Sequence, residues 1–209
     1  SGGKPCLIDD SFKCRKENWV ILIGYPLEDK FFIDRLEAVF SRVKKEFRPE
    51  FVSLIAPQMP PGLAEICQET ESDAYFTLKA QKPEIRSPLK RNLRKARQNV
   101  HVEISTLMQD SHQELMHEFV ARTPLSERVE RLLFKMPEFT AGSDTALVLN
   151  AWDEADKLAA FYVVDLEAKR FSNYITGCHS KKNYVRGASD LLLFELINLS
   201  LKYDKPYIH

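Results

Sequence analysis

The sequence predicts an α/β protein of the α+β type, in which two lobes each hold a mixed, mostly antiparallel sheet flanked by helices. Two orders of elements support this, β-α-β-α-β in the front half and β-α-α-β-β-β-α-β in the back half, with a strongly basic helix between them. The chain has 209 residues, 44% of them hydrophobic, which is enough for one large core or two small ones. We expect a partial N-terminal lobe over 4–86, a connector helix over 87–99, and a C-terminal lobe over 100–209 that continues beyond residue 209.

The front half begins with a strand and an amphipathic helix. Residues 19–24 form a continuous apolar run with β-branched members, which predicts a strand buried on both faces. Apolar residues then recur at helical spacing from Phe32 to Phe47, with Asp29 as the N-cap and Pro49 as the stop. Strands are predicted over 51–55 and 74–78, with a short helix over 63–68 between them.

The basic helix opens at Ser87-Pro88 and runs to about residue 98. Its apolar stripe is thin. None of its cations has an acidic residue four positions away to pair with; these cations are Lys90, Arg91, Arg94, Lys95 and Arg97. One interpretation is a surface for a polyanion, either polyphosphate, an RNA backbone or an anionic lipid headgroup. The other is a solvated connector whose charges meet carboxylates of the two lobes.

The back half alternates helices and strands at short intervals. A strand is predicted over 102–107, followed by a helix over 111–122 and a second helix that begins at Ser126 and stops before Pro137. Strands are predicted over 146–152, 158–165 and 171–178. A largely apolar helix over 188–203 and a last strand from Pro206 complete the lobe.

Charge and cysteine content limit the classes of partner. Lys plus Arg and Asp plus Glu both number 30, so net charge gives no general attraction to nucleic acid or membrane. Apolar runs are too short to span a bilayer and no signal peptide is present, so we expect a cytoplasmic protein.

The four widely spaced cysteines are expected to be reduced and mostly buried. We predict no metal site, because Cys178 and His179 are strand neighbours that point to opposite faces.

A short basic loop, residues 181–189, leads into the last long helix. The first turn of a helix offers free backbone N–H groups and the positive end of its dipole, which favour an anion. We predict a phosphate-bearing donor here, held near Gly187, Ala188 and Ser189 with Lys182 and Arg186 adding charge. The alternative is an ordinary first turn in which Gly187 eases a tight bend.

The preceding strand carries two candidates for proton transfer. His179 is a candidate general base, or else a surface residue, and Tyr174 is a candidate proton donor, or else a packing residue. Strand alternation places them on opposite faces unless a bulge intervenes. Gly177, between them, indicates either close approach of a ligand or a bulge.

The back half resembles the N-acyltransferase superfamily called GNAT, and the front half resembles the trailing part of a second copy. Tandem lobes joined by a basic segment such as 89–96 are similar to the Fem-type aminoacyltransferases and to the cytoplasmic domain of phosphatidylglycerol lysyltransferase. The matching motifs are Gly24-Tyr25-Pro26, the basic helix and residues 187–192. The chain departs from the GNAT Gln/Arg-x-x-Gly-x-Gly/Ala pattern, because Arg186 to Ser189 holds a single glycine.

The resemblance implies a function and a donor. It implies transfer of an acyl or aminoacyl group to an amine, from acyl-coenzyme A or aminoacyl-tRNA bound at residues 181–189. The alternative is a non-catalytic module of the same fold that binds RNA or another polyanion through the basic helix. The sequence does not specify the acceptor or the oligomeric state.

Overall fold

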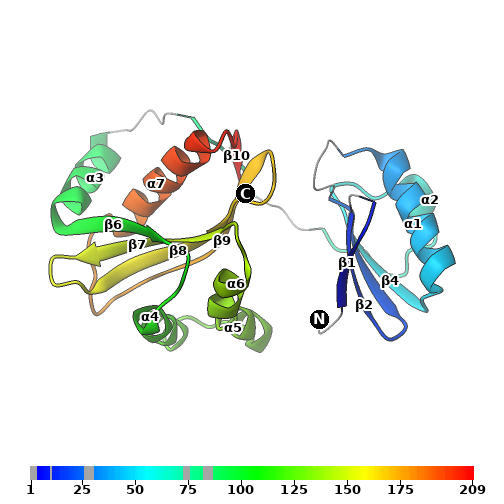
Figure 1. Ribbon diagram of the computed structural model, residues 1–209, viewed down its shortest axis with the longest axis horizontal. Coiled ribbons are helices and arrows are strands. Elements are labelled where there is room, and N and C mark those ends of the chain that lie inside the picture. Colours follow the sequence, from blue (N-terminus) through cyan, green and yellow to red (C-terminus); the bar gives the residue numbers. More distant parts are fainter. Residues whose placement is uncertain (1–3, 10, 26–30, 73–75, 82–86) are drawn as a thin grey trace. The chain divides into compact units, whose positions relative to one another are not determined.

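The computed structural model describes residues 4–9, 11–25, 31–72, 76–81 and 87–209 (Figure 1). The chain divides into two compact units, Ser1–Ala74 and Tyr75–His209. The basic helix α3 (Ser87–Asn99) therefore lies within the second unit, where its buried Leu93 and Ala96 join the core. In the described ranges, no helix combines the length and the apolar character needed to cross a bilayer.

The first unit is a four-stranded sheet with two helices. Its strands follow the chain in the order β1-β2-β3-β4; the first three are antiparallel, and β4 runs parallel to β3. The elements are β1 (Lys4–Ile8), β2 (Ser11–Lys16), β3 (Trp19–Ile23), α1 (Ile33–Phe47), β4 (Phe51–Ile55) and α2 (Pro61–Ala64). Strands β1 and β2 were not predicted, because their apolar residues are interrupted by charged ones such as Lys13 and Arg15.

Several predictions for the first unit need correction. Strand β3 is buried on one face only, since Val20 and Leu22 are fully buried whereas Trp19 is 53% exposed. Helix α2 is a single turn and not six residues. The strand predicted over 74–78 is instead the two-residue β5 (Leu78–Lys79), which belongs to the second sheet. The predicted N-cap Asp29 lies outside the described residues.

The second unit is a six-stranded sheet in the order β5-β10-β9-β8-β7-β6. Its remaining elements are β6 (Val100–Ser105), α4 (Asp110–Val120), α5 (Glu127–Leu133), α6 (Met136–Gly142), β7 (Ala146–Asp153), β8 (Leu158–Asp165), β9 (Phe171–His179), α7 (Ala188–Lys202) and β10 (Tyr207–Ile208). Ser126 caps α5 as predicted, because its Oγ accepts from the Val129 amide at 3.4 Å. Pro137 does not end the helical region, because it occupies the first turn of α6, where a missing N–H costs nothing.

Two cores fill the two faces of this sheet. On one face α3 and α7 cover β7 and β8, around the fully buried Leu192 and Leu196. On the other, α4, α5 and α6 enclose the fully buried Met116 and Phe161 (Figure 1). The sheet is therefore closed on both faces, and access to its strands is along its edges.

The two units repeat one topology. In the first, β1-β2-β3-α1-β4 has two antiparallel pairings and then a helix crossover to a parallel strand. In the second, β7-β8-β9-α7-β10 has the same pairings in the same order. The two units therefore share one order of strand pairings, as a front half that is a partial second copy of the back half would have.

All four thiols are free, but the prediction that most are buried is wrong. Cys6 and Cys67 are exposed, Cys14 is half-buried, and Cys178 is buried.

Candidate functional site

A bulge interrupts β9 at its centre. Thr176 pairs with Val163 and Tyr174 pairs with Val164 on β8, so that Ile175 is an extra residue. The bulge reverses the strand alternation between Tyr174 and the residues that follow, which the sequence left open. The Tyr174 ring meets the Tyr162 ring edge-on, at 4.9 Å between centroids.

Gly177 leaves room for this pair of tyrosines. A Cβ at Gly177 would lie 2.5 Å from Cδ1 of Tyr162 and 2.6 Å from the hydroxyl of Tyr174. The glycine therefore allows close approach of two side chains of the protein itself. The same geometry places the Tyr174 hydroxyl beside Gly177, two residues, or about 7 Å along a strand, from His179.

Strand β9 has an open edge beyond the bulge. Parallel pairing with β10 covers Phe171 and Ser172, and the Tyr174 amide donates to the His209 carbonyl at 2.7 Å. Along 175–179, no described strand pairs with that edge. The Ser180 amide donates toward β8, to the Ala159 carbonyl at 2.8 Å, so alternation directs the amides of Gly177 and His179 to the open edge.

The loop after β9 leads into α7 through Gly187, whose φ of 85° is in the left-handed region. The Ala188 amide donates to the Val185 carbonyl at 3.2 Å, and the Lys182 amide donates to Glu118 at 3.2 Å. The amides of Gly187, Ser189 and Asp190 have no hydrogen-bond partner in the described part of the chain. Two of the five predicted donor-binding residues thus have occupied amides, and the free amides gather at the start of α7.

The predicted cations of the loop are exposed. Lys182 and Arg186 lie at the surface, and neither forms an ion pair with a described residue. Gly187 has a packing role of its own, because a Cβ there would lie 2.9 Å from the backbone oxygen of Asn92 on α3. The positive φ of Gly187 fits the predicted alternative of a tight bend, close packing against α3 is a second reason for the glycine, and neither occupies the free amides.

A carboxylate that the sequence analysis did not identify holds the start of the loop. Glu118 on α4 accepts hydrogen bonds from the Ser180 hydroxyl at 2.8 Å and from the Lys181 amide at 2.5 Å, besides the Lys182 amide. Burial raises the pKa of Glu118, but these hydrogen bonds and the positive charge of Arg122 outweigh it, so its pKa lies below the ordinary value.

His179 and Tyr174 have different neighbours and opposite pKa shifts. His179 lies against Phe119 and Arg122, and the Arg122 guanidinium donates to its carbonyl. Burial, then Arg122, lowers the pKa of His179, so its imidazole is neutral at neutral pH. Burial raises the pKa of Tyr174, which keeps its proton, and raises the pKa of Tyr162 to about 12.

Cys178 is not a candidate nucleophile. It is 2% exposed and packs in the core beneath α4, α5 and α6. Burial raises its pKa to about 12, so the reactive thiolate is absent at neutral pH.

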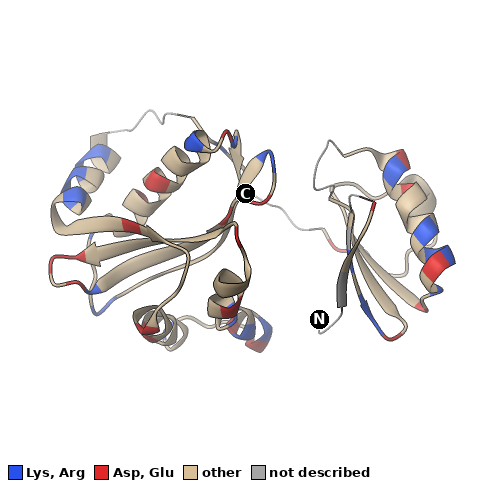
Figure 2. Ribbon diagram, viewed as in Figure 1, with Lys and Arg blue, Asp and Glu red and all other residues tan. Residues whose placement is uncertain are grey.

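Lys and Arg positions recur along the basic helix α3 (Figure 2). Lys90, Arg91, Arg94 and Lys95 are exposed and form no ion pair with a described residue. Arg97 is the exception, because it lies over the Phe194 ring at 4.9 Å and 3.9 Å from a carboxylate oxygen of Glu195.

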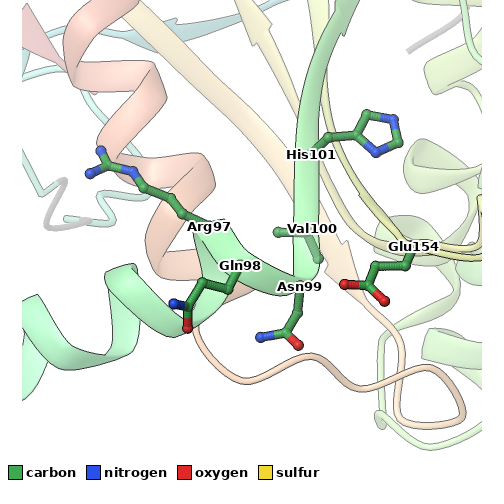
Figure 3. Close-up of a pocket in the computed structure, with 6 residues that line it drawn as sticks. All are labelled: Arg97, Gln98, Asn99, Val100, His101 and Glu154. Carbon is green, nitrogen blue, oxygen red and sulfur yellow. The ribbon is translucent and has the colours of Figure 1, made fainter.

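A small hollow lies where α3 joins β6. It is lined by Arg97, Gln98, Asn99, Val100, His101 and Glu154. Figure 3 shows Glu154 reaching toward Asn99 from the β7–β8 turn, whereas Arg97 points toward α7. Tyr174, His179 and the loop residues are not among its lining, so this hollow is separate from the β9 site.

Residues of the site that were not predicted from the sequence include Glu118 and Tyr162, for different reasons. Glu118 occurs in the helix predicted over 111–122, which also holds Glu114, and its partners lie 62 to 64 residues away. Tyr162 belongs to an apolar strand, and nothing in its local pattern indicates that it faces Tyr174. Its hydroxyl donates to the Ser189 carbonyl at 3.0 Å, which ties β8 to the first turn of α7.

Comparison with known proteins identifies the fold of this chain. Protein-family models and curated proteins give no match. Solved structures match over nearly the whole chain. FemX has a TM-score of 0.60 and 8% identity, over 95% of this chain and 74% of that one. A GCN5-related N-acetyltransferase from Kribbella flavida has a TM-score of 0.51 and 9% identity, over 99% and 78%.

A third match is the C-terminal domain of a putative lysylphosphatidylglycerol synthetase from Agrobacterium fabrum. Its TM-score is 0.57 with 15% identity, over 99% of this chain and 69% of that domain. Identities this low show a shared fold. The chain therefore has the GNAT fold, as the sequence predicted.

Proposed function

We propose that the chain transfers an acyl or aminoacyl group from a phosphate-bearing donor to an amine, at the open edge of β9. The observation that carries this proposal is that Tyr162 joins the two parts: its ring lies against Gly177 of that edge, and its hydroxyl donates to the Ser189 carbonyl at the start of α7. A donor with a linear arm and a phosphate group matches this arrangement, because the arm pairs with an open strand edge and the phosphate meets the helix N-terminus. The chain's structural neighbours support the same general chemistry.

The residues along the edge supply groups that acyl transfer needs. Amides at a strand bulge are suited to hold a carbonyl oxygen as negative charge develops on it. His179, with its lowered pKa, is suited to take the proton of the attacking amine. Tyr174, with its raised pKa, keeps a proton to give to the leaving group, whether a thiolate or a ribose oxygen.

Hydrogen exchange of the free protein and of its mixtures with acyl-coenzyme A or aminoacyl-tRNA tests the proposal. One of the two donors is expected to slow exchange at Gly187, Ser189 and Asp190 and along 175–179. Inorganic pyrophosphate should compete at the three helix amides only. Which donor protects the site identifies the donor class, and the proposal fails if neither does.

A matched pair of variants sharpens this experiment. Arg186→Gln removes an exposed cation beside the amides and is expected to weaken donor binding about tenfold. Lys202→Gln removes an exposed cation at the far end of α7 and should leave donor binding unchanged. Equal effects of the two would mean that the donor does not bind at the start of α7.

We propose polyanion binding by α3 as the second candidate function. It is favoured by the four exposed cations that meet no described carboxylate, so the helix does not have the neutralised surface of a plain connector. Sequence-independent contacts with phosphates give binding that weakens steeply with salt.

The salt dependence of RNA binding tests this second candidate. Changing Lys90, Arg91, Arg94 and Lys95 to glutamine should lower the slope of log K against log salt by about 0.7 to 0.9 for each phosphate that is no longer neutralised. The double change Lys44→Gln and Lys45→Gln, in the last turn of α1, should leave the slope unchanged. An unchanged slope in the α3 variant would contradict the proposal.

A further inference from the structure

Two residues at the C-terminal end of α4 contact the segment in which β9 passes into the loop before α7. Glu118 lies in the last turn of α4 and Arg122 in the turn that follows it, and together they contact four consecutive residues, 179–182. Arg122 donates to the His179 carbonyl. Glu118 then accepts from the Ser180 hydroxyl and from the amides of Lys181 and Lys182.

The Glu118 carboxylate accepts hydrogen bonds from these donors, in the place that an external anion would take. Two successive amides and a hydroxyl converge on its two oxygens, at 2.5, 3.2 and 2.8 Å. Ser180 is 3% exposed, and its Oγ also accepts from the Asn183 amide at 2.8 Å, which closes the turn. The first turn of the loop is therefore fixed from inside the protein, and its amides are not available to an external phosphate.

We propose that Glu118 is a positioning residue that sets the loop in the shape that a donor requires, an inference that rests on the proposed donor site. Asn183 donates to the Lys157 carbonyl at 3.1 Å, so the fixed turn is also tied to the β7–β8 hairpin. With one end held in this way, the amides of Lys181 and Lys182 are occupied, whereas those of Gly187, Ser189 and Asp190 at the start of α7 are free. Donor phosphate is thus directed to the start of α7 and away from Lys181 and Lys182.

The same contacts couple the loop to the candidate base. The Arg122 guanidinium holds the His179 backbone and lies 3.4 Å from its Nε2. The Arg122 Nε is buried without a hydrogen-bond acceptor among the described residues, so this guanidinium is fixed by the contacts to His179 and by its packing on Phe119. Loss of Glu118 is therefore expected to disturb the loop first and His179 second.

We call the contacts of Glu118 with Ser180, Lys181 and Lys182 the clamp. Hydrogen exchange of the donor-free protein tests the clamp independently of any activity. In Glu118→Ala, the amides of Lys181 and Lys182 should exchange at least about tenfold faster, because their acceptor is gone, whereas amides of the β8–β9 ladder keep their rates. In Glu118→Gln, the remaining side-chain oxygen should restore slow exchange at both. Glu114→Ala, an exposed glutamate one turn earlier on α4, is the matched control and should change neither.

The outcomes separate this inference from the proposed function. Unchanged exchange at Lys181 and Lys182 in Glu118→Ala would overturn the clamp, and so would a uniform rise across the β8–β9 ladder. With a donor present, Glu118→Ala should raise KM for the donor about tenfold with little change in kcat, and Glu118→Gln should restore it. A clamp seen in exchange with no donor bound by any variant would mean that the proposed function fails and the clamp stands.

Discussion

His112→Ala is expected to lower the free energy of unfolding of the second unit by about 3 kcal/mol. The imidazole is 1% exposed and is bonded through both nitrogens. Nδ1 accepts from the Gln109 amide at 2.9 Å, so Nε2 carries the proton and donates to Oδ1 of Asn150 at 2.8 Å. The substitution leaves an amide and a side-chain oxygen without partners and opens a cavity beside the Phe161 ring, whose centroid is 5.2 Å away.

Urea unfolding followed by tryptophan fluorescence measures this loss. The chain has two tryptophans, one in each unit, so Trp19→Phe leaves Trp152 to report on the second unit. The control is His117→Ala, on the same helix but exposed, where alanine removes only the stacking of the imidazole on Phe134 and the cost should stay below about 1 kcal/mol. Equal losses for His112 and His117 would show that the buried hydrogen bonds contribute nothing.

Gly187→Ala is expected to destabilise the second unit by about 2 to 3 kcal/mol and to displace the candidate donor site. Two causes add. The φ of 85° strains any residue that has a Cβ, and that Cβ would lie 2.9 Å from the Asn92 carbonyl oxygen, so α3 or the start of α7 has to move. Because Leu93 and Ala96 of α3 belong to the same core as α7, movement there is resisted by packing.

The matched control for this change is Gly142→Ala. Gly142 is the last residue of α6, its φ is not positive, and a Cβ there meets nothing within 4 Å. Alanine should therefore be neutral or stabilising by up to about 1 kcal/mol. The same fluorescence measurement compares the two variants, and a loss no greater for Gly187 than for Gly142 would refute the requirement for glycine at the start of α7.

The sequence predicted regular elements well wherever apolar residues follow one period. Strand β4 and strand β8 have the predicted bounds, and α7 ends within one residue of its prediction. Prediction failed where charge interrupts the pattern, as in β1 and β2, and where a proline opens a helix instead of ending one, as in α6. Local periodicity reports burial of one face, and strands with charged residues facing solvent give a weak signal.

The candidate site was predicted in part. Its location, at the end of β9 and the start of α7, follows from the order of elements and from Gly187. Glu118 was not predicted, because a glutamate on a helix has no local feature that indicates a partner some 63 residues away. The bulge at Ile175 was left open for a similar reason, since it exists only in the register between β8 and β9.

The amino-acid sequence alone therefore accounts for the fold class and for the basic, glycine-containing loop before the last long helix, but not for strands β1 and β2 of the repeated topology. Tertiary packing sets which amides of that loop are free, which face of β9 its side chains share, and which helix holds the loop in place. The physical reason is the distance along the chain between the residues that interact. Hydrophobic period and turn chemistry act between residues close in the chain, whereas a hydrogen bond such as that between Glu118 and Lys181 depends on the packing of α4 against β9.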